Sequence, residues 1–589
     1  MRYLYSIFAF GLAALPHQSH AQQGPCPLLG PVFPPIRDPL SSSTFANSID
    51  RLNNTLHELE RNGTFQGLNA TFYVQAFSAS ETLFQHGHVP PEMKGFLTSQ
   101  TLNEDTVFRI GSVSKLITVY TLLAEVGMER MHDSVTRWVP ELARAAKKNK
   151  GDPTRRVQWD EVTIGQLCGH MAGIGRNLGL FDMATFIGPS NANPEQYGLP
   201  VLDDKEKPRC SIAEPSLGPC SRKEFFQGLT AQTNFPITST SNTPVYSNLA
   251  YQILAYALEG MTGNSFEKSL KSSLLRPLSM KRTTLEAPKS KKNAIIPEND
   301  LLSWWNITTG DSSPYGGIFS TAADLTRLGQ SILNSSILSP STTRSWLKPT
   351  THTADLHMSV GMPWEIRRAL LPLGHGGTRV VDLYTKNGAF GLYSAMIVLS
   401  PDHELGYVVL LAGSGSNNLL GYLPDLLTET LLPAAEYAAR EHAAARFAGI
   451  YQGASNKMTV EMNETLVVRN WTRGGIDVLS THASIIWPGS GVEPVLRLYP
   501  MGLEDDRTMS FRGIYEPEAM EESDAKATEA SSGLFSSGCL SWGLVDMLTY
   551  GNVGSDDFEF EIDQRGKVTG LRPRMMRETL QKVDKGYAW

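Results

Sequence analysis

Three short runs of β-forming residues follow one another in the second half of the chain, and they constrain its fold more than any other feature. They span residues 379–386, 392–399 and 405–412, and turns that contain Gly or Pro-Asp separate them. Connections this short join antiparallel strands, because a parallel pair needs a crossover of about a dozen residues or more. The pattern therefore predicts an antiparallel meander, which a long helix over 419–439 follows.

The first half of the chain alternates between strand and helix patterns. Residues 72–84 alternate in polarity around a turn, which predicts one or two strands. After the extended run Phe108-Arg109-Ile110, apolar residues continue at helical spacing to Val126, and further helices are expected over 47–68, 162–168, 246–261 and 319–333. The segment 176–223 is polar, aperiodic and rich in Pro and Gly, and a loop this long inside a compact domain is commonly functional or disordered.

The chain has 589 residues, which is too many for a single core. We predict a main domain over 70–440, preceded by a lead at 22–69 and followed by a β-rich domain over 444–589. That last region has short strand patterns with Gly and Asn turns, and an acidic, Ala- and Ser-rich stretch at 516–532 interrupts it.

The first 21 residues resemble a secretory signal peptide and are excluded from the fold prediction. Arg2 precedes an apolar run that ends at Leu15, and Ser19-His20-Ala21 is a small-x-small cleavage pattern. The protein is therefore expected to be secreted and extracellular. A chain that enters the secretory pathway can be glycosylated at Asn-x-Ser/Thr triplets. Such triplets begin at Asn53, Asn62, Asn69, Asn306, Asn334, Asn463 and Asn470.

The five cysteines are Cys26, Cys168, Cys210, Cys220 and Cys539. Cys210 and Cys220 bracket a short loop and form the expected disulfide, with two free thiols as the alternative. Cys168 lies in an apolar helical stretch, which is typical of a small core residue. No Cys–His spacing indicates zinc, and His86-Gly87-His88 is interpreted as a turn and not as metal ligands. No metal or cofactor is expected.

The first motif that carries chemistry is Ser-x-x-Lys, which places a hydroxyl and an amine one turn apart on the same face of a helix. It begins at Ser112, Ser265, Ser345 and Ser523. Only Ser112 lies between an extended run and a long apolar helix, where the positive end of the helix dipole favours a developing alkoxide. The alternative for Ser112 is a simple helix cap.

Two further motifs follow in order. Tyr246-Ser247-Asn248 has the form Tyr-x-Asn, which also occurs at Tyr550. Lys386-Asn387-Gly388 closes the first run of the meander, so its lysine brings an ammonium group to the tip of a strand. Its glycine allows that strand to approach a neighbouring backbone closely.

The ordered motifs resemble those of the serine β-lactamase and penicillin-binding-protein superfamily. The resemblance covers roughly residues 70–440, including 162–175, 245–283, 316–331 and 362–413. It is closest to the branch of class C β-lactamases, D,D-carboxypeptidases and esterases, which carries tyrosine in the second motif. The layout resembles secreted fungal β-lactamase-like proteins with an extra C-terminal domain. It implies an α/β fold in which helices flank an antiparallel sheet, with a helical subdomain and a smaller β-rich domain.

The resemblance also implies roles for the motif residues. Ser112 becomes acylated, Lys115 and Tyr246 share the proton transfer, and Asn248 holds the acyl side chain and Lys115. Lys386 polarises Tyr246 or binds a substrate carboxylate, and Gly388 belongs to the same motif. The backbone N–H groups of Ser112 and Ala389 would form the oxyanion hole.

Two departures from the family pattern argue against β-lactamase activity. Asn387 replaces the commoner Thr or Ser, and the segment 176–223 is unusually long. A second candidate for the third motif is His375-Gly376-Gly377, which resembles the His-x-Gly form of some esterases. We favour Lys386, because it ends a run of β-formers whereas glycines surround His375.

The sequence therefore predicts a serine hydrolase that forms an acyl-enzyme on a small-molecule ester, lactone or amide. The alternatives are an acyltransferase of secondary-metabolite biosynthesis that uses the same serine, and an inactive binding protein. The net charge of −7, from 52 basic and 59 acidic residues, lacks the basic footprint of a nucleic-acid binder. No membrane anchor is expected, and the sequence does not indicate an oligomeric state.

Overall fold

A computed structural model describes residues 26–149, 151–187, 193–214, 216–231, 234–372, 378–489, 491, 493–517 and 539–583. The predicted signal peptide lies outside these residues, as do His375 and Ser523. None of the helices in the described ranges is long and apolar enough to cross a membrane.

The chain forms two compact units. The larger one contains Ala46–Ala369 and Asp382–Leu431, and the other contains the described residues up to Phe45, Leu370–Val381 and Leu432–Trp589. This division differs from the predicted ranges, because the lead at 22–69 is split between the units. Packing, and not order along the chain, determines which unit a segment joins.

An antiparallel sheet forms the centre of the larger unit. Within the described residues it has eight strands in the order β2-β1-β10-β9-β8-β7-β6-β5. The meander β8-β9-β10 confirms the pattern of the three β-runs, and β1 joins it by pairing with β10, with Ala76 opposite Tyr407. The strands are β1 (Ala70–Ser78), β2 (Thr82–His88), β5 (Thr351–His352), β6 (Met358–Val360), β7 (Glu365–Pro372), β8 (Thr378–Phe390), β9 (Tyr393–Ser400) and β10 (Leu405–Gly413).

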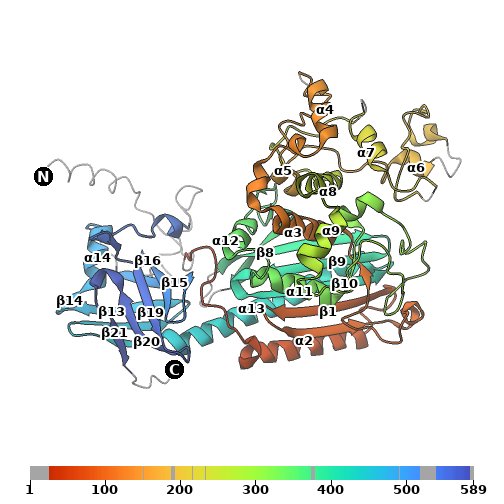
Figure 1. Ribbon diagram of the computed structural model, residues 1–589. Coiled ribbons are helices and arrows are strands. Elements are labelled where there is room, and N and C mark those ends of the chain that lie inside the picture. Colours follow the sequence, from red (N-terminus) through yellow and green to blue (C-terminus); the bar gives the residue numbers. More distant parts are fainter. Residues whose placement is uncertain are drawn as a thin grey trace. The chain divides into compact units, whose positions relative to one another are not determined.

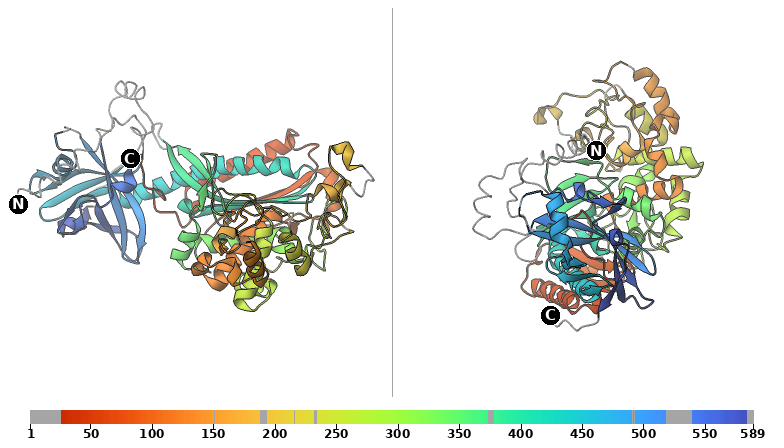
Figure 2. Two further views of the ribbon diagram at one scale, coloured as in Figure 1. Left: turned by 90° about the horizontal axis from the view of Figure 1, so that it is seen from above. Right: turned by 90° about the vertical axis from the view of Figure 1, so that its left-hand side faces the viewer.

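Helices cover both faces of this sheet (Figures 1 and 2). One face carries α2 (Ser43–Arg61) and the first part of α13 (Ser416–Phe447). The remaining helices lie on the other face or in the helical part beyond it: α3 (Ser114–Val126), α4 (Pro140–Asn149), α5 (Ile164–Cys168), α6 (Met183–Ile187), α7 (Arg222–Leu229), α8 (Leu249–Thr262), α9 (Phe266–Leu270), α10 (Ser313–Gly316), α11 (Ala322–Leu333) and α12 (Pro340–Trp346).

The two central helices of the larger unit are α3 and α8. In α8 every residue from Leu249 to Leu258 is buried, so the predicted amphipathic helix over 246–261 is wrong in character and begins three residues too early. A helix that is apolar on all sides belongs in a core rather than at a surface. Its burial fixes the position of the segment that precedes it, which carries Tyr246.

The prediction of a turn at His86-Gly87-His88 is wrong, because these residues lie in β2. His86 pairs with Val74 and His88 with Phe72 on β1. Gly87 is needed there for a different reason: an added Cβ would lie 3.0 Å from a ring carbon of Tyr73. A glycine inside a strand often marks such close packing.

The second unit is rich in β-structure, and among its described residues nine strands form one sheet. The sheet closes on itself in the manner of a barrel, because β12 also pairs with β13. Trp471, Phe511 and Phe558 are among its fully buried side chains. Its elements are β11 (Gly449–Gln452), β12 (Asn456–Met462), β13 (Leu466–Arg473), β14 (Ile476–Asp477), α14 (Val478–Ile486), β15 (Pro494–Glu504), β16 (Thr508–Pro517), β17 (Thr549–Tyr550), β18 (Val553–Gly554), β19 (Asp557–Ile562), β20 (Val568–Pro573) and β21 (Leu580–Val583).

Two disulfides are present. Cys210 and Cys220 are bridged as predicted, with their Cα atoms 4.9 Å apart. A second bridge joins Cys26 to Cys539 across 513 residues and ties the N-terminal segment to the second unit, to which both belong. Cys168 is free and buried, as expected of a small core residue.

Candidate active site

Ser112 lies at the start of α3, in a tight turn over Gly111–Val113. Before this turn, Phe108 and Arg109 form the short strand β3, which pairs with Phe319 and Ser320 of β4. The pairing holds the chain extended up to the point where the helix begins. Ser112 is half-buried, whereas Lys115, one turn later, is fully buried.

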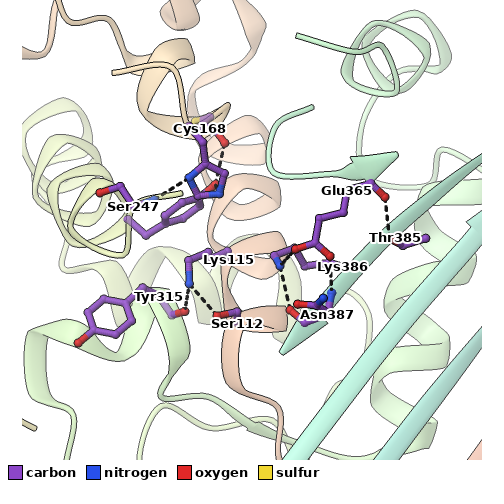
Figure 3. A network of polar contacts seen from close by, with 11 residues as sticks. Ser112, Lys115, Cys168, Ser247, Tyr315, Glu365, Thr385, Lys386 and Asn387 are labelled. Carbon is purple, nitrogen blue, oxygen red and sulfur yellow. Dashed lines mark hydrogen bonds and ion pairs between the residues drawn. The ribbon is translucent and has the colours of Figure 1, made fainter. Parts of the chain in front are cut away.

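The Lys115 amine contacts the Ser112 hydroxyl directly, with 2.9 Å between Nζ and Oγ (Figure 3). The same amine donates a hydrogen bond to the carbonyl oxygen of Tyr315 in α10, at 2.6 Å. Complete burial lowers the pKa of Lys115 to about 8. A buried amine with this pKa can exchange a proton near neutral pH, as a general base must.

Tyr246 lies against both lysines of the site. The Nζ atoms of Lys115 and Lys386 are 4.9 Å and 5.5 Å from the centre of its ring. Burial alone would raise the pKa of the Tyr246 phenol, but the charges of the two lysines lower it to about 8. Ionisation of the phenol near neutral pH is therefore easier, and its phenolate form is a second group that can take up a proton.

Two residues outside the three motifs lie against Tyr246. His170 stacks on its ring at a centroid distance of 4.5 Å, and its Nδ1 accepts a hydrogen bond from the backbone N–H of Ser247. Burial keeps the pKa of His170 well below its usual value, so its ring is neutral. The Arg176 guanidinium lies 4.8 Å from the centre of the Tyr246 ring.

Lys386 is fully buried and forms an ion pair with Glu365 of β7, with 2.5 Å between Nζ and Oε1 (Figure 3). The second carboxylate oxygen of Glu365 accepts the backbone N–H of Asn387 at 3.1 Å. Burial alone would lower the pKa of Lys386, but the Glu365 carboxylate raises it. Lys386 is therefore a permanent cation whose charge Glu365 balances.

The third motif lies inside β8 and not at its tip, because the strand continues to Phe390. At this point the strand touches the start of α3. A Cβ at Gly388 would lie 2.2 Å from the carbonyl oxygen of Ile110 and 2.6 Å from the backbone nitrogen of Ser112. Gly111 is equally confined, since its Cβ would lie 2.5 Å from the nitrogen of Ala389. Two glycines thus allow β8 and the nucleophile turn to pack backbone against backbone.

The remaining predicted site residues lie nearby. Ala389 is exposed in β8 next to this contact, with Gly388 before it. Asn248 is the residue before α8, and its amide donates to Asn177 at 2.6 Å. Within the described chain Lys115 is held by Tyr315 instead of by Asn248. His375, the rival candidate for the third motif, lies outside the described residues.

A cleft of about 380 Å³ opens beside Tyr246 and Glu365. Pro244, Met358 and Trp364 are among the residues that line it, together with His170. The walls next to the charged groups are therefore largely apolar, as is usual for a pocket that binds a small organic molecule.

Acyl-group chemistry on serine requires a hydroxyl, groups that can accept its proton, and N–H donors for the oxyanion. The site has the first two, and the backbone nitrogens of Ser112 and Ala389 lie at the contact between β8 and the nucleophile turn. The family model described as Beta-lactamase matches residues 92–432. The chain belongs to the β-lactamase family. A second model, described as "Beta-lactamase-like-like, C-terminal domain", matches residues 439–584.

Three relatives extend the comparison. A "Beta-lactamase-like protein" of Arthroderma benhamiae is 28% identical over 539 residues, which is 85% of this chain and 85% of that protein. "Probable hydrolase M10" of a Phoma species is 26% identical and covers 77% of this chain and 72% of its own length. The D-alanyl-D-alanine-carboxypeptidase/endopeptidase AmpH of Escherichia coli K12 is 24% identical over 55% of this chain and 76% of its own.

These matches confirm the resemblance inferred from the three motifs and the extra C-terminal domain, and the fold inferred with it. Glu365, His170 and Tyr315 are not among the residues that the sequence motifs predict for the site. A predicted strand at 365–372 next to the Lys386 strand would have pointed to Glu365. Tyr315 contacts Lys115 only through its backbone carbonyl oxygen, so no pattern of side chains in the sequence can indicate this contact.

Proposed function

We propose that this protein is a secreted serine hydrolase that forms an acyl-enzyme at Ser112 on an uncharged ester, lactone or amide. The observation that carries the proposal is the 2.9 Å contact between Lys115 Nζ and Ser112 Oγ beside a tyrosine with a lowered pKa. Membership of a hydrolase family and the hydrolase name of the Phoma relative support it.

In the proposed reaction the Ser112 hydroxyl loses its proton to the Lys115–Tyr246 pair while Oγ bonds to the substrate carbonyl carbon. The carbonyl oxygen becomes an oxyanion, which the N–H groups of Ser112 and Ala389 stabilise. The bond to the leaving group then breaks, and the alcohol or amine departs with the proton. Water reverses these steps on the acyl-enzyme: it delivers its proton to the same pair and releases the acid and free Ser112.

The ion pair between Lys386 and Glu365 is the reason for proposing an uncharged substrate. A free ammonium beside the nucleophile would attract a carboxylate on the substrate, but the Lys386 charge is already balanced by Glu365 at 2.5 Å. A second anion there would face the Glu365 carboxylate, which lines the cleft, and two negative charges this close repel each other. Lys386 then acts by polarising Tyr246, which is the first of the two roles that the family resemblance implies.

A substrate panel tests the function. The full chain would be given a chromogenic short-chain ester, a lactone, an amide, a D-amino-acid amide and a cephalosporin, each with and without an added alcohol. We expect turnover of the neutral ester at least tenfold faster than of the cephalosporin. Faster release of the chromophore with alcohol, together with a new ester product, would assign acyl transfer instead. No turnover and no labelling by a fluorophosphonate would indicate an inactive binding protein.

The charge balance at Lys386 gives a separate prediction. Glu365→Gln keeps the hydrogen-bond acceptor for Lys386 but removes the negative charge, so the ammonium becomes available to an anion. The ratio of kcat/KM for an ester that carries a carboxylate to that for its uncharged amide analogue should rise about tenfold or more. Asp382→Asn is the matched control, because it removes a carboxylate from another ion pair between the same two strands: Asp382 of β8 pairs with Arg368 of β7 at 3.3 Å. An unchanged ratio in Glu365→Gln contradicts the argument.

A further inference from the structure

Four side chains converge in the larger unit, at a place that the reaction does not use. His57 and Glu60 belong to α2, and His86 and His88 belong to β2. The helix α2 covers the face of the sheet opposite to the one that carries α3 (Figure 1), and Ser112 lies in the turn that leads into α3. The cluster is therefore separate from the proposed active site.

The local structure explains why these side chains meet. Residues three apart on a helix share a face, which pairs His57 with Glu60. Residues two apart on a strand share a face, so His86 and His88 both point toward the helix. The sequence pattern is His-x-x-Glu on the helix and His-x-His on the strand.

The distances describe a compact set of donor atoms. Glu60 Oε1 lies 2.9 Å from His86 Nε2 and 3.0 Å from His88 Nδ1, and Glu60 Oε2 lies 3.2 Å from His57 Nδ1. Single ligand atoms of His57, Glu60 and His86 all lie within 4.8 Å of one another. Around a tetrahedral ion with bonds of about 2.0–2.2 Å, neighbouring ligand atoms are about 3.3–3.6 Å apart. Rotation of the His57 side chain, which is 53% exposed, can close the set further.

The two strand histidines are held by aromatic packing. Phe72 stacks on His86 and on His88, at centroid distances of 6.1 Å and 5.2 Å, and Phe65 also lies against His88. The side chain of His86 is only 5% exposed, whereas His57 opens the cluster to solvent. His88 Nε2 is buried and has no hydrogen-bond partner in the described part of the chain. The donor set is thus rigid on one side and accessible on the other.

We propose that His57, Glu60 and His86 bind a divalent transition-metal ion of the zinc type, with His88 orienting the carboxylate. Two imidazoles and one carboxylate are a donor set that zinc accepts, with a fourth position left for water. A hydrogen bond from a neighbouring side chain to a ligating carboxylate is the usual way such a ligand is oriented. The ion would join α2 to the edge strand β2 and stabilise that side of the larger unit.

Zinc titration of the untagged full chain, after removal of metal with a chelator, tests this site. We expect one zinc ion to bind and to raise the Tm of the larger unit, because a ligand that binds only the folded state stabilises it. His57→Ala, at an exposed position, should weaken binding by about 10–100-fold or more. His357→Ala, at an exposed histidine outside the cluster, should leave zinc affinity unchanged.

Glu60→Gln distinguishes a metal site from a network of hydrogen bonds. Glutamine still accepts hydrogen bonds from neutral histidines but is a poor zinc ligand. We expect the variant to fold and to lose the zinc-induced rise in Tm, with ester hydrolysis unchanged. The proposal is overturned if the wild-type chain takes up no zinc, or if His57→Ala and Glu60→Gln bind zinc as tightly as the wild type.

Discussion

Ser112→Ala should reduce ester hydrolysis by about 10⁴-fold or more, and it should abolish labelling by a fluorophosphonate. Loss of a serine nucleophile removes the covalent route entirely, and what remains is rate enhancement by binding and by the oxyanion donors. The fold should survive. The Ser112 hydroxyl contacts Lys115, which keeps its hydrogen bond to Tyr315, so the expected cost in unfolding free energy is about 0.5–2 kcal/mol.

Ser265→Ala is the matched control for this prediction. Ser265 also begins a Ser-x-x-Lys sequence, but its side chain caps α9 by accepting the backbone N–H of Lys268. Its loss should lower the free energy of unfolding by about 1 kcal/mol and leave hydrolysis unchanged. Labelling rates and chemical denaturation of both variants provide the check. Ser112 is not the nucleophile if Ser112→Ala is labelled at the wild-type rate.

The contrast between these two serines shows what the sequence could reveal. The motif is identical, and only the surroundings separate a helix cap from a candidate nucleophile: an extended run before Ser112 and an apolar helix after it. Burial of that helix could be predicted, because its apolar residues continue without a polar face. The glycine of the third motif predicts that its strand approaches a neighbouring backbone closely. The structure shows why a side chain is excluded there: an added Cβ at Gly388 would lie 2.2 Å from the Ile110 carbonyl oxygen.

Other parts of the structure could not be predicted, because they depend on contacts between distant segments. Glu365 reaches Lys386 through the neighbouring strands β7 and β8, and no strand was predicted at 365–372. The bridge from Cys26 to Cys539 spans 513 residues, which no local spacing can indicate. The sequence His86-Gly87-His88 is compatible with a turn, and only the packing of β2 against Tyr73 places Gly87 in a strand.

Lys386→Met should reduce kcat/KM for a neutral ester by about 100-fold, the scale expected of a disabled general acid–base pair. In the wild type the Lys115–Tyr246 pair must lose a proton to act as a base, and the pKa of each partner is lowered to about 8. Activity should therefore rise with pH through about 8 and then level off. Without the Lys386 cation the pKa of Tyr246 rises, so the rising limb should move upward by about 1–3 pH units.

The variant leaves Glu365 without its partner, and an unpaired buried carboxylate destabilises the fold and adds a negative charge near Tyr246. The double variant Lys386→Met/Glu365→Gln removes both charges and separates these effects. If the Lys386 charge itself polarises Tyr246, the double variant keeps an upward shift of the rising limb but unfolds less readily than Lys386→Met. A pH profile that returns to the wild-type position in the double variant would mean that the unpaired Glu365 carboxylate, and not the missing ammonium, caused the shift.

The same measurement decides between the two candidates for the third motif. A cation that polarises Tyr246 must be held at a fixed distance, and Lys386 meets this requirement because it is fully buried in β8 with its Nζ 5.5 Å from the centre of the Tyr246 ring. His375→Ala should therefore change kcat/KM less than about tenfold and leave the pH profile in place. If His375→Ala loses about 100-fold or more while Lys386→Met stays active, the third motif is His375-Gly376-Gly377. The Lys386–Glu365 pair would then be a structural ion pair beside the site. The proposal of an uncharged substrate would fail with it, because that proposal assumes that Lys386 is the cation next to the nucleophile.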